Sequence, residues 1–126
     1  MNLPDDRRYA PTHEWVLQQD DGDWLLGITD HAQDQLGDLV FVGEVKVGSR
    51  LNAGDVAAVV ESVKTASDLY APANGEVIAF NDDLEASPEK INEAPYETWI
   101  FRFRPDNAAD LDQLLDASGY AAQVDE

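Results

Sequence analysis

The sequence predicts one domain of mainly β structure, a small sandwich or barrel, and three observations lead to that fold class. The chain has 126 residues, a length that suits one domain but is too short for two lobes. It is 44% hydrophobic and contains three Trp, which is enough apolar material for one core. Its apolar residues occur in short runs, which favours strands over long helices. Gly48, Gly54 and Gly75 separate these runs, and short strands at this spacing are typical of small sandwiches and barrels.

The predicted strands are short and mostly apolar. They cover residues 15–17, 24–26, 39–42, 56–60, 75–80 and 99–103. Asp21 and Gly22 form a common turn pair and predict a hairpin between the first two strands. In the last strand, large apolar residues alternate with basic ones, which indicates one buried and one solvated face, and Pro105 is expected to end it.

Two short helical segments are predicted from their capping residues. Residues 29–37 are expected to form a helix with Asp30 as the N-cap and a glycine as the C-terminal stop. Ser87 followed by Pro88 has the chemistry of a helix start and predicts a single helical turn before Ile91.

A further helix is predicted near the C-terminus, over about residues 107–119. Either Asp106 or Asn107 can cap it, because both side chains accept hydrogen bonds from a first helical turn. The apolar stripe expected to pack on the sheet consists of Leu111, Leu114 and Leu115. Residues 121–126 are expected to fray.

The chain is strongly acidic, which limits the classes of partner. It has 26 Asp plus Glu against 8 Lys plus Arg, so its formal net charge is −18 at pH 7. This charge repels phosphate backbones and anionic lipid headgroups, and we expect neither nucleic acid nor a membrane as a partner. Partners with basic docking patches complement this acidic surface better. An acidic surface also opposes self-association, so we expect a monomer.

The sequence has no cysteine and no recognisable targeting segment. Disulfides, thiolate metal sites and cysteine nucleophiles are therefore excluded. Residues 1–6 resemble neither a signal peptide nor a transit peptide, and no run approaches the roughly 18 apolar residues of a membrane helix. We expect a cytoplasmic protein, or a mitochondrial one only if a transit peptide has been removed.

Two similar segments direct attention to the residue between them. Residues 54–59 and 75–80 share the order Gly, acid, Val, apolar, Ala, apolar, and the midpoint between their first residues, Gly54 and Gly75, falls beside Lys64. This predicts two related halves joined by a hairpin with Lys64 at its tip. Lys64 is also the only cation between Arg50 and Lys90. A rigid tip that presents one lysine suits a modifying enzyme, so the amine is a candidate attachment point for a prosthetic group.

The residues around Lys64 carry a resemblance to a known family. Residues 61–72, ESVKTASDLYAP, closely resemble the lipoyl-lysine motif of the H-protein family of the glycine cleavage system. Residues 9–16, 27–42, 74–77 and 111–120 look like the same family in the same order, so the resemblance covers nearly the whole chain. It implies a lipoyl- or biotinyl-type barrel-sandwich hybrid of two small antiparallel sheets, with a hairpin-tip lysine and short helices that include one at the C-terminus.

The resemblance further implies one domain over residues 1–126, with a lipoyl-binding core of about 22–104 and the C-terminal helix of about 107–119. Lys64 would carry (R)-lipoate in amide linkage, and the protein would be a carrier and not a catalyst. The implied partners are glycine decarboxylase (P protein), aminomethyltransferase (T protein), dihydrolipoyl dehydrogenase (L protein) and the lipoylating enzymes. The carrier takes the aminomethyl group of glycine from the pyridoxal-phosphate decarboxylase to the folate-dependent transferase and is then reoxidised by the dehydrogenase.

A groove for the arm is also implied by the resemblance. We expect the arm to lie on Ile28, Ala32 and Leu36, where the carried group is shielded from water, with its cationic amine near Glu14. The alternatives are ordinary core packing for the three apolar residues and a plain surface acid for Glu14.

Four residues beside the lysine are assigned to recognition by the lipoylating enzyme or by partners: Glu61, Ser62, Val63 and Asp68. The alternative for the two acids is a solvated charge pair. Two departures from the family pattern bear on local loop geometry and on partner contacts, and not on the family assignment. Residues 95–99 are shorter than usual and lack glycine, and residues 42–48 lack a Leu-Pro pair.

Other functions fit the sequence less well. A Ser-Lys nucleophile from Ser62 and Lys64 needs a neutral, desolvated lysine and an oxyanion hole, and no Gly-rich loop stands beside the pair. His13 and His31 lack the spacing of a zinc-protease helix, so neither a catalytic nor a metal site is expected.

Two other carrier classes remain open. A biotinyl domain shares the hairpin-tip lysine, but biotin carriers typically have Met on both sides of it, where this chain has Val63 and Thr65. A lipoyl donor to other complexes would have the same modification site, so the sequence does not distinguish it from a shuttling carrier.

Overall fold

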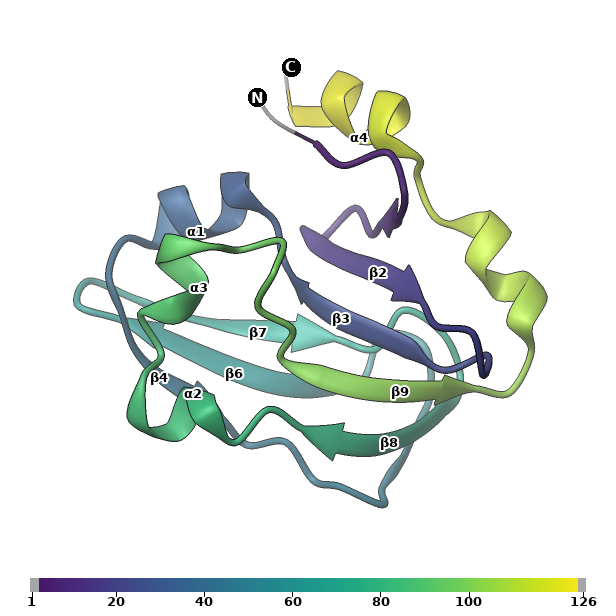
Figure 1. Cartoon of the computed structure of the whole chain (residues 1–126), viewed down its shortest axis with the longest axis horizontal. Helices are drawn as coiled ribbons and strands as arrows, with labels where there is room; N and C mark the ends of the chain where they lie inside the picture. Colours follow the sequence, from purple (N-terminus) through teal and green to yellow (C-terminus); the bar gives the residue numbers. More distant parts are fainter. Residues whose placement is uncertain (1–2, 125–126) are drawn as a thin grey trace.

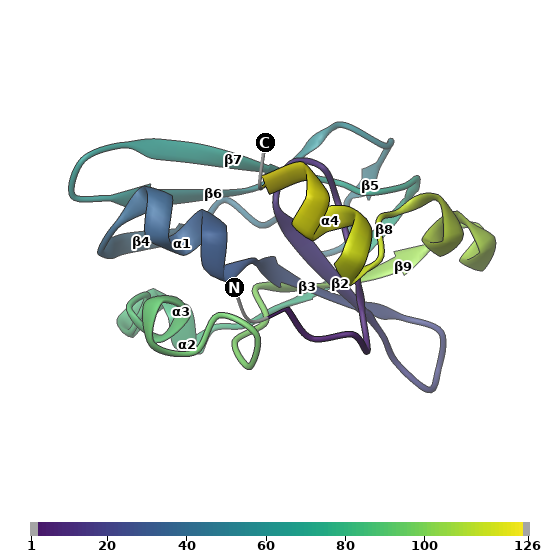
Figure 2. The same cartoon turned by 90° about the horizontal axis from the view of Figure 1, so that it is seen from above.

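The computed structural model describes residues 3–124, which form strands in two antiparallel sheets joined by short helical segments (Figures 1 and 2). The strands are β1 (Arg8–Tyr9), β2 (Glu14–Gln18), β3 (Trp24–Ile28), β4 (Leu39–Gly43), β5 (Arg50–Leu51), β6 (Val56–Ser62), β7 (Ala66–Tyr70), β8 (Gly75–Phe80) and β9 (Phe101–Pro105). The helical segments are α1 (Asp30–Leu36), α2 (Asp83–Ala86), α3 (Lys90–Glu93), the 3-10 helix η1 (Ala108–Gln113) and α4 (Ala117–Val124).

The larger sheet has the strand order β1-β2-β3-β9-β8-β5, and the smaller one has the order β4-β6-β7. Every pairing within them is antiparallel. The predicted fold class, mainly β with two small antiparallel sheets, is therefore confirmed. Each of the six predicted strand regions overlaps a strand of the structure. At the predicted first turn, Gly22 adopts a φ of 92°, a conformation that glycine reaches without strain.

The main core lies between the two sheets. The larger sheet contributes fully buried aromatic side chains such as Trp24, Phe101 and Phe103, and the smaller sheet contributes aliphatic ones such as Val60 and Leu69. Burial on this scale removes apolar surface from water and is the main stabilising contribution to the fold.

The last strand, β9, alternates as predicted. Phe101 and Phe103 face the core, whereas Arg102 and Arg104 point outward and both bind the buried carboxylate of Asp23. Nε of each arginine lies 2.9 Å from an oxygen of that carboxylate. The two guanidinium groups, with Arg104 first, hold the pKa of Asp23 below its ordinary value.

The N-cap of helix α1 lies one residue earlier in the sequence than predicted. The N-cap is Thr29, whose extended backbone lets Oγ1 accept a hydrogen bond from the Ala32 amide at 3.2 Å. The prediction of Asp30 as the cap was wrong, because its carboxylate instead accepts a hydrogen bond from the Gln33 side chain. Gly37 ends the helix, as predicted, with a φ of 82°.

The segment around Ser87 also differs from the prediction. Ser87 ends a helix, α2, that the sequence did not reveal, because its amide donates to the Asp83 carbonyl at 3.0 Å. The predicted turn before Ile91 is present, since the Lys90 amide donates to the Ser87 carbonyl at 3.2 Å, but helix α3 starts at Lys90 and includes Ile91. Ile91 is fully buried, and its burial sets the position of this short helix more strongly than the capping chemistry does.

The C-terminal region is two helical segments and not one helix over 107–119. Asn107 caps η1, as one of the two predicted caps. The helix is interrupted because Leu114 is extended and Leu115 pairs with Tyr9 through two backbone hydrogen bonds of 2.7 and 2.8 Å. Residues 121–124 are helical rather than frayed. Residues 125 and 126 lie outside the described part of the chain.

Helix α4 lies beside the N-terminal segment of the described chain, on one side of the molecule (Figure 1). The β6–β7 hairpin extends from the other side, next to α1 (Figures 1 and 2). Across residues 3–124, no helix combines the length and the apolar character needed to span a membrane.

Candidate functional site

Lys64 lies at the tip of the β6–β7 hairpin, as predicted, between the last paired residues Glu61 and Ala66. The turn is fixed by Ser62. Its Oγ accepts hydrogen bonds from the amides of Lys64 (3.3 Å) and Thr65 (3.1 Å), and its own amide donates to the Thr65 carbonyl at 2.7 Å. A side chain that closes a turn in this way removes backbone freedom at the tip. Ser62 is therefore a structural residue of the turn.

The tip is also attached to the segment between α1 and β4. The amide of Val63 donates to the carbonyl of Asp38 at 3.1 Å. The side chain of Asn92 supports this segment from α3, since it donates to the carbonyl of Gly37 and accepts from the amide of Leu39, both at 2.9 Å. The hairpin tip is thus held from two sides.

The Lys64 side chain is exposed at this tip. Its stem passes Gly37, where a Cβ atom would lie 3.5 Å from Lys64 Cε. Within residues 3–124, the ammonium group forms neither a hydrogen bond nor an ion pair. Glu61 and Asp68 are exposed too, and neither binds Lys64. A Ser-Lys nucleophile does not fit this geometry, because the amine is solvated and the Ser62 hydroxyl is committed to the turn.

A groove of about 290 Å³ lies beside β7 and α1. It brings together three residues that the sequence assigned to the arm, Ile28, Ala32 and Leu36. The others that line it are Thr12, His13, His31, Gln35, Ser67 and Leu69. Ile28 is fully buried, and Ala32 and Leu36 pack partly on the core, so the same side chains serve the core and form the groove wall.

Glu14 lies in an adjacent pocket of about 500 Å³ that shares Thr12 with the groove. It is only 1% exposed, so the alternative of a plain surface acid was wrong. Its carboxylate accepts hydrogen bonds from the Thr12 hydroxyl and, at 3.3 Å, from the amide of Tyr70 at the end of β7. Burial raises the pKa of Glu14, and these hydrogen bonds act in the opposite direction.

The groove contains two histidines that sequence reasoning did not assign to it. The rings of His13 and His31 lie with their centroids 4.9 Å apart. His13 has a φ of 78°, which is uncommon outside glycine, and its Nδ1 lies 2.6 Å from the hydroxyl of Tyr120. Both histidines belong to segments that carried the family resemblance, but the sequence could not show that they face one cavity.

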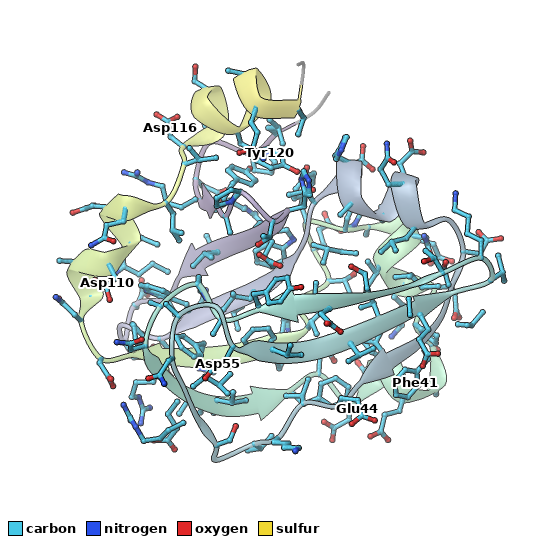
Figure 3. All side chains as sticks on the ribbon, turned by 180° about the vertical axis from the view of Figure 1, so that it is seen from behind. Phe41, Glu44, Asp55, Asp110, Asp116 and Tyr120 are labelled. Atoms are coloured by element: carbon cyan, nitrogen blue, oxygen red, sulfur yellow. The ribbon has the colours of Figure 1, made fainter. Side chains whose placement is uncertain are left out.

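Tyr120 connects this groove to the C-terminal helix. Its hydroxyl also lies 2.7 Å from Oγ1 of Thr29, the cap of α1. Its ring is fully buried, stacks on Tyr9 and points from α4 toward the strands (Figure 3). The C-terminal helix therefore supports both the residue that caps the groove helix and the imidazole beside the groove.

Comparisons with known proteins agree with this geometry. A family model described as Glycine cleavage H-protein matches residues 7–126. The chain is 64% identical to a protein of Bordetella pertussis named Glycine cleavage system H protein, over 97% of this chain and 98% of that protein. The chain belongs to the glycine cleavage H-protein family. A Pseudomonas putida relative, Glycine cleavage system H protein 2, is 55% identical over 99% of this chain and 98% of its own.

A solved H-protein structure supports the fold assignment. The glycine cleavage system H protein from Mycobacterium marinum superposes with a TM-score of 0.87 at 38% identity, over 98% of this chain and all of that one. The predicted lipoyl-type barrel-sandwich fold, like the predicted family, is confirmed.

The residues at the tip and the groove are chemically suited to the lipoyl group that this family suggests. An exposed primary amine on a fixed turn can be acylated, and the apolar wall of Ile28, Ala32 and Leu36 can contact an aliphatic chain. No group of three His, Cys, Asp or Glu side chains in the part of the chain that the structure describes is placed to hold a metal ion.

The short loop at residues 95–99, where a departure from the family pattern was expected, packs on the face of the larger sheet that carries Trp15, away from the main core. The Pro95 carbonyl accepts a hydrogen bond from the Trp15 indole at 2.9 Å, and the Tyr96 hydroxyl accepts one from the Asp30 amide at 3.1 Å. Arg7 donates to the Tyr96 carbonyl at 2.8 Å. This loop therefore helps to position the start of α1.

Proposed function

We propose that the chain is a lipoyl-bearing carrier of the glycine cleavage system, with (R)-lipoate in amide linkage on Lys64. One observation carries the proposal: Lys64 presents a free, exposed amine on a turn that Ser62 and Asp38 hold in place, next to an apolar groove. The family names of its relatives support the same role. When bound, lipoate supplies a reducible disulfide whose sulfur can carry the aminomethyl group of glycine.

The groove supplies a dry surface for the arm. Ile28, Ala32 and Leu36 offer apolar contacts, which favour an aliphatic chain over water. A carried aminomethyl group is prone to hydrolysis, so a wall that excludes water protects it. The chain's own residues thus bind, orient and shield, and the protein is a carrier and not a catalyst.

Glu14 is the proposed partner for the cationic amine of the carried group. Its carboxylate is buried and held by the Thr12 hydroxyl and the Tyr70 amide. Burial alone disfavours its charge, as the raised pKa indicates. A cation beside it favours the ionised form, so Glu14 and an arriving amine stabilise each other.

Recognition of the tip is assigned to Glu61, Val63 and Asp68, all exposed, with Ser62 acting through the turn. The proposed partners are glycine decarboxylase, aminomethyltransferase, dihydrolipoyl dehydrogenase and the lipoylating enzymes. We also propose one functional domain over residues 1–126. Its lipoyl-binding part extends beyond the expected 22–104, because β2 and the Thr12–His13 segment contribute to the groove and its neighbouring pocket.

A cytoplasmic monomer without nucleic-acid or membrane partners is part of the same proposal. The net charge of −18 supports the monomer and the exclusion of nucleic-acid and membrane partners, because it opposes self-association and contact with anionic surfaces. A mitochondrial location applies only if a transit peptide has been removed.

Mass spectrometry of the chain, after incubation with a lipoylating enzyme and lipoate, tests the attachment site. We expect one lipoyl increment on the wild type and on the controls Lys46→Arg and Lys90→Arg, and none on Lys64→Arg, because a guanidinium is not acylated in this way. A lipoyl increment on Lys64→Arg would move the site elsewhere. A biotinyl increment from cells would indicate the biotin-carrier alternative.

Reconstitution tests the carrier role. The lipoylated chain is expected to support glycine-dependent turnover with glycine decarboxylase and aminomethyltransferase. Absence of turnover by a fully lipoylated chain contradicts the shuttle and favours the lipoyl-donor alternative.

The role of Glu14 has its own test. We expect loaded Glu14→Ala protein to lose its aminomethyl group faster than loaded wild type in the absence of partner enzymes. Glu44→Ala is the control, because Glu44 is an exposed acid outside both the groove and the Glu14 pocket. An unchanged rate of loss in Glu14→Ala rejects this role for the residue.

A further inference from the structure

Exposed apolar side chains gather beside Lys64. Across the described residues, the large hydrophobic side chains that stand open to solvent are Val40 (56% exposed), Phe41 (39%), Val47 (58%), Val56 (49%) and Val63 (72%). Three of them, Val40, Phe41 and Val63, lie next to the hairpin tip and are called the tip patch below. Clustered exposed apolar residues on a folded protein indicate an interaction site.

Backbone pairing places the tip patch together. Val63 is attached to Asp38, which directly precedes β4, and the first pairs between β4 and β6 are Leu39 with Ser62 and Phe41 with Glu61. A β-bulge between Leu39 and Phe41 breaks the alternation of the strand. Because of it, Val40 and Phe41 are both exposed, where regular alternation would bury one of them.

Phe41 is held flat on the sheet. A Cβ atom at Gly43 would lie 2.6 Å from Cζ of Phe41, so the ring covers the backbone of a residue that has no side chain. Gly43 is paired with Val59, which keeps this backbone in the sheet. Figure 3 shows Phe41 at the same end of the molecule as the hairpin turn. The ring therefore packs on the backbone of β4 while part of it stays open to solvent.

The rim of the tip patch is acidic. Asp38 and Glu61 are both exposed beside it, and neither has an ion-pair partner within residues 3–124. A complementary surface therefore has an apolar centre flanked by Lys or Arg side chains.

We propose that the tip patch is the docking surface for the enzyme that acylates Lys64, and this inference rests on the lipoylation proposed above. Before acylation, the reactive amine is only one lysine side chain away from the backbone, so the enzyme must cover the residues around the tip to reach it. Enzymes that act on the finished arm meet the reactive sulfur far from the tip and do not need this contact. The tip patch therefore governs attachment of the arm more than its later use.

The experiment compares two double variants, in each of which two exposed valines are replaced by serine. Val40→Ser/Val63→Ser removes the tip patch valines, and Val47→Ser/Val56→Ser changes two valines of similar exposure away from the tip. Initial rates of lipoylation are measured on the unmodified chains with a purified lipoate ligase, lipoate and ATP. Thermal unfolding of each variant verifies that the fold is retained.

We expect kcat/KM for lipoylation to fall by about fivefold or more in Val40→Ser/Val63→Ser and to stay within about twofold of wild type in the control. Once fully lipoylated, the single variant Val40→Ser, which changes no residue assigned above to partner recognition, should support glycine-dependent turnover like the wild type. Equal lipoylation rates in the two variants, or a loss of turnover without a loss of lipoylation, overturn the proposal.

Two further readouts separate the possible failures. Wild type that is not lipoylated at all contradicts the proposed function, whereas normal lipoylation of every variant contradicts only the docking surface. Sedimentation at increasing concentration tests a second copy of the chain as the occupant. A dimer of the wild type that the tip patch variant abolishes would assign the patch to self-association and overturn the proposal.

Discussion

Nδ1 of His13 lies 2.6 Å from the hydroxyl oxygen of Tyr120, and the same hydroxyl lies 2.7 Å from Oγ1 of Thr29. One phenol on α4 therefore supports the groove at two points. Burial raises the pKa of Tyr120 to about 12, so the phenol is neutral at physiological pH and keeps its proton for these hydrogen bonds.

Replacement of this phenol should destabilise the fold. We expect Tyr120→Phe to lower the free energy of unfolding by about 1–3 kcal/mol, because His13 and Thr29 each lose a partner in a buried setting. Unfolding by urea measures this change in the free energy of unfolding. Tyr70→Phe is the control, since the Tyr70 hydroxyl has no hydrogen bond among residues 3–124, and a change within about 0.5 kcal/mol is expected there. Equal effects of the two substitutions would contradict the structural role of the Tyr120 hydroxyl.

Titration of His13 should make stability depend on pH. Burial, followed by the nearby His31, lowers the pKa of His13 below its ordinary 6.5. The folded state therefore favours the neutral imidazole. The contribution of His13 to the free energy of unfolding is fully present above about pH 6.5 and is lost as the pH falls through the lowered pKa. The measurement is the unfolding free energy at pH 7.5 and pH 5.0.

His13→Asn is the matched variant for that measurement, because Asn tolerates the positive φ of this position and does not titrate. Wild type should lose more stability than His13→Asn between the two pH values. If both lose the same amount, His13 does not contribute to the pH dependence.

Replacement of Asp23 should lower the thermal stability more than replacement of an exposed acid in a similar ion pair. Asp23→Asn leaves Arg104 without a carboxylate and Arg102 with Asp21 alone, and we expect the midpoint of thermal unfolding to fall by about 5 °C or more at pH 7. The control is Asp106→Asn, whose partner Arg50 is exposed, and little change is expected there.

The contribution of Asp23 to the stability of the fold should disappear in strong acid. Its pKa is lowered in the fold, so its stabilising effect is present above the ordinary value of 3.8 and disappears as the pH falls through the lowered pKa. The difference between wild type and Asp23→Asn should therefore shrink in strong acid. A difference that is constant down to about pH 2 would show that the carboxylate charge is not its source.

Ser62 should control the order of the hairpin tip. In Ser62→Ala, the amides of Lys64 and Thr65 lose their acceptor, and we expect their hydrogen exchange to quicken by about tenfold while amides in the strands are unaffected. Ser67→Ala is the control, because Ser67 is exposed on β7 and its hydroxyl makes no hydrogen bond in the described structure. Unchanged exchange at the two tip amides would mean that the β6–β7 pairing alone fixes the turn.

Features determined by neighbouring residues could be predicted from the sequence. The turn at Gly22 and the end of α1 at Gly37 depend on local backbone geometry, and both were predicted correctly. The alternation of Phe101 and Phe103 with basic residues also reports directly on burial. The position of Lys64 at a hairpin tip came from the repeated pattern on either side of it.

Features that depend on distant contacts could not be predicted in the same way. The stripe that contains Leu115 reads as helix, but its backbone pairs with Tyr9, and this tertiary contact overrides the local preference. Glu14 reads as a surface acid in isolation, whereas the fold buries it under the amide of Tyr70. The side chains of His13 and Tyr120 meet only because the two ends of the sequence lie together.

The pairing of Tyr9 with Leu115 also fixes the order in which the molecule can be assembled. The β6–β7 hairpin contains only near neighbours in sequence, so it can close as soon as its own residues are synthesised. The groove wall that contains His13 cannot close at that stage, because Leu115 and Tyr120 are synthesised long after the hairpin residues. A nascent chain therefore presents its lysine turn before its groove exists, and only a chain synthesised past Tyr120 has both.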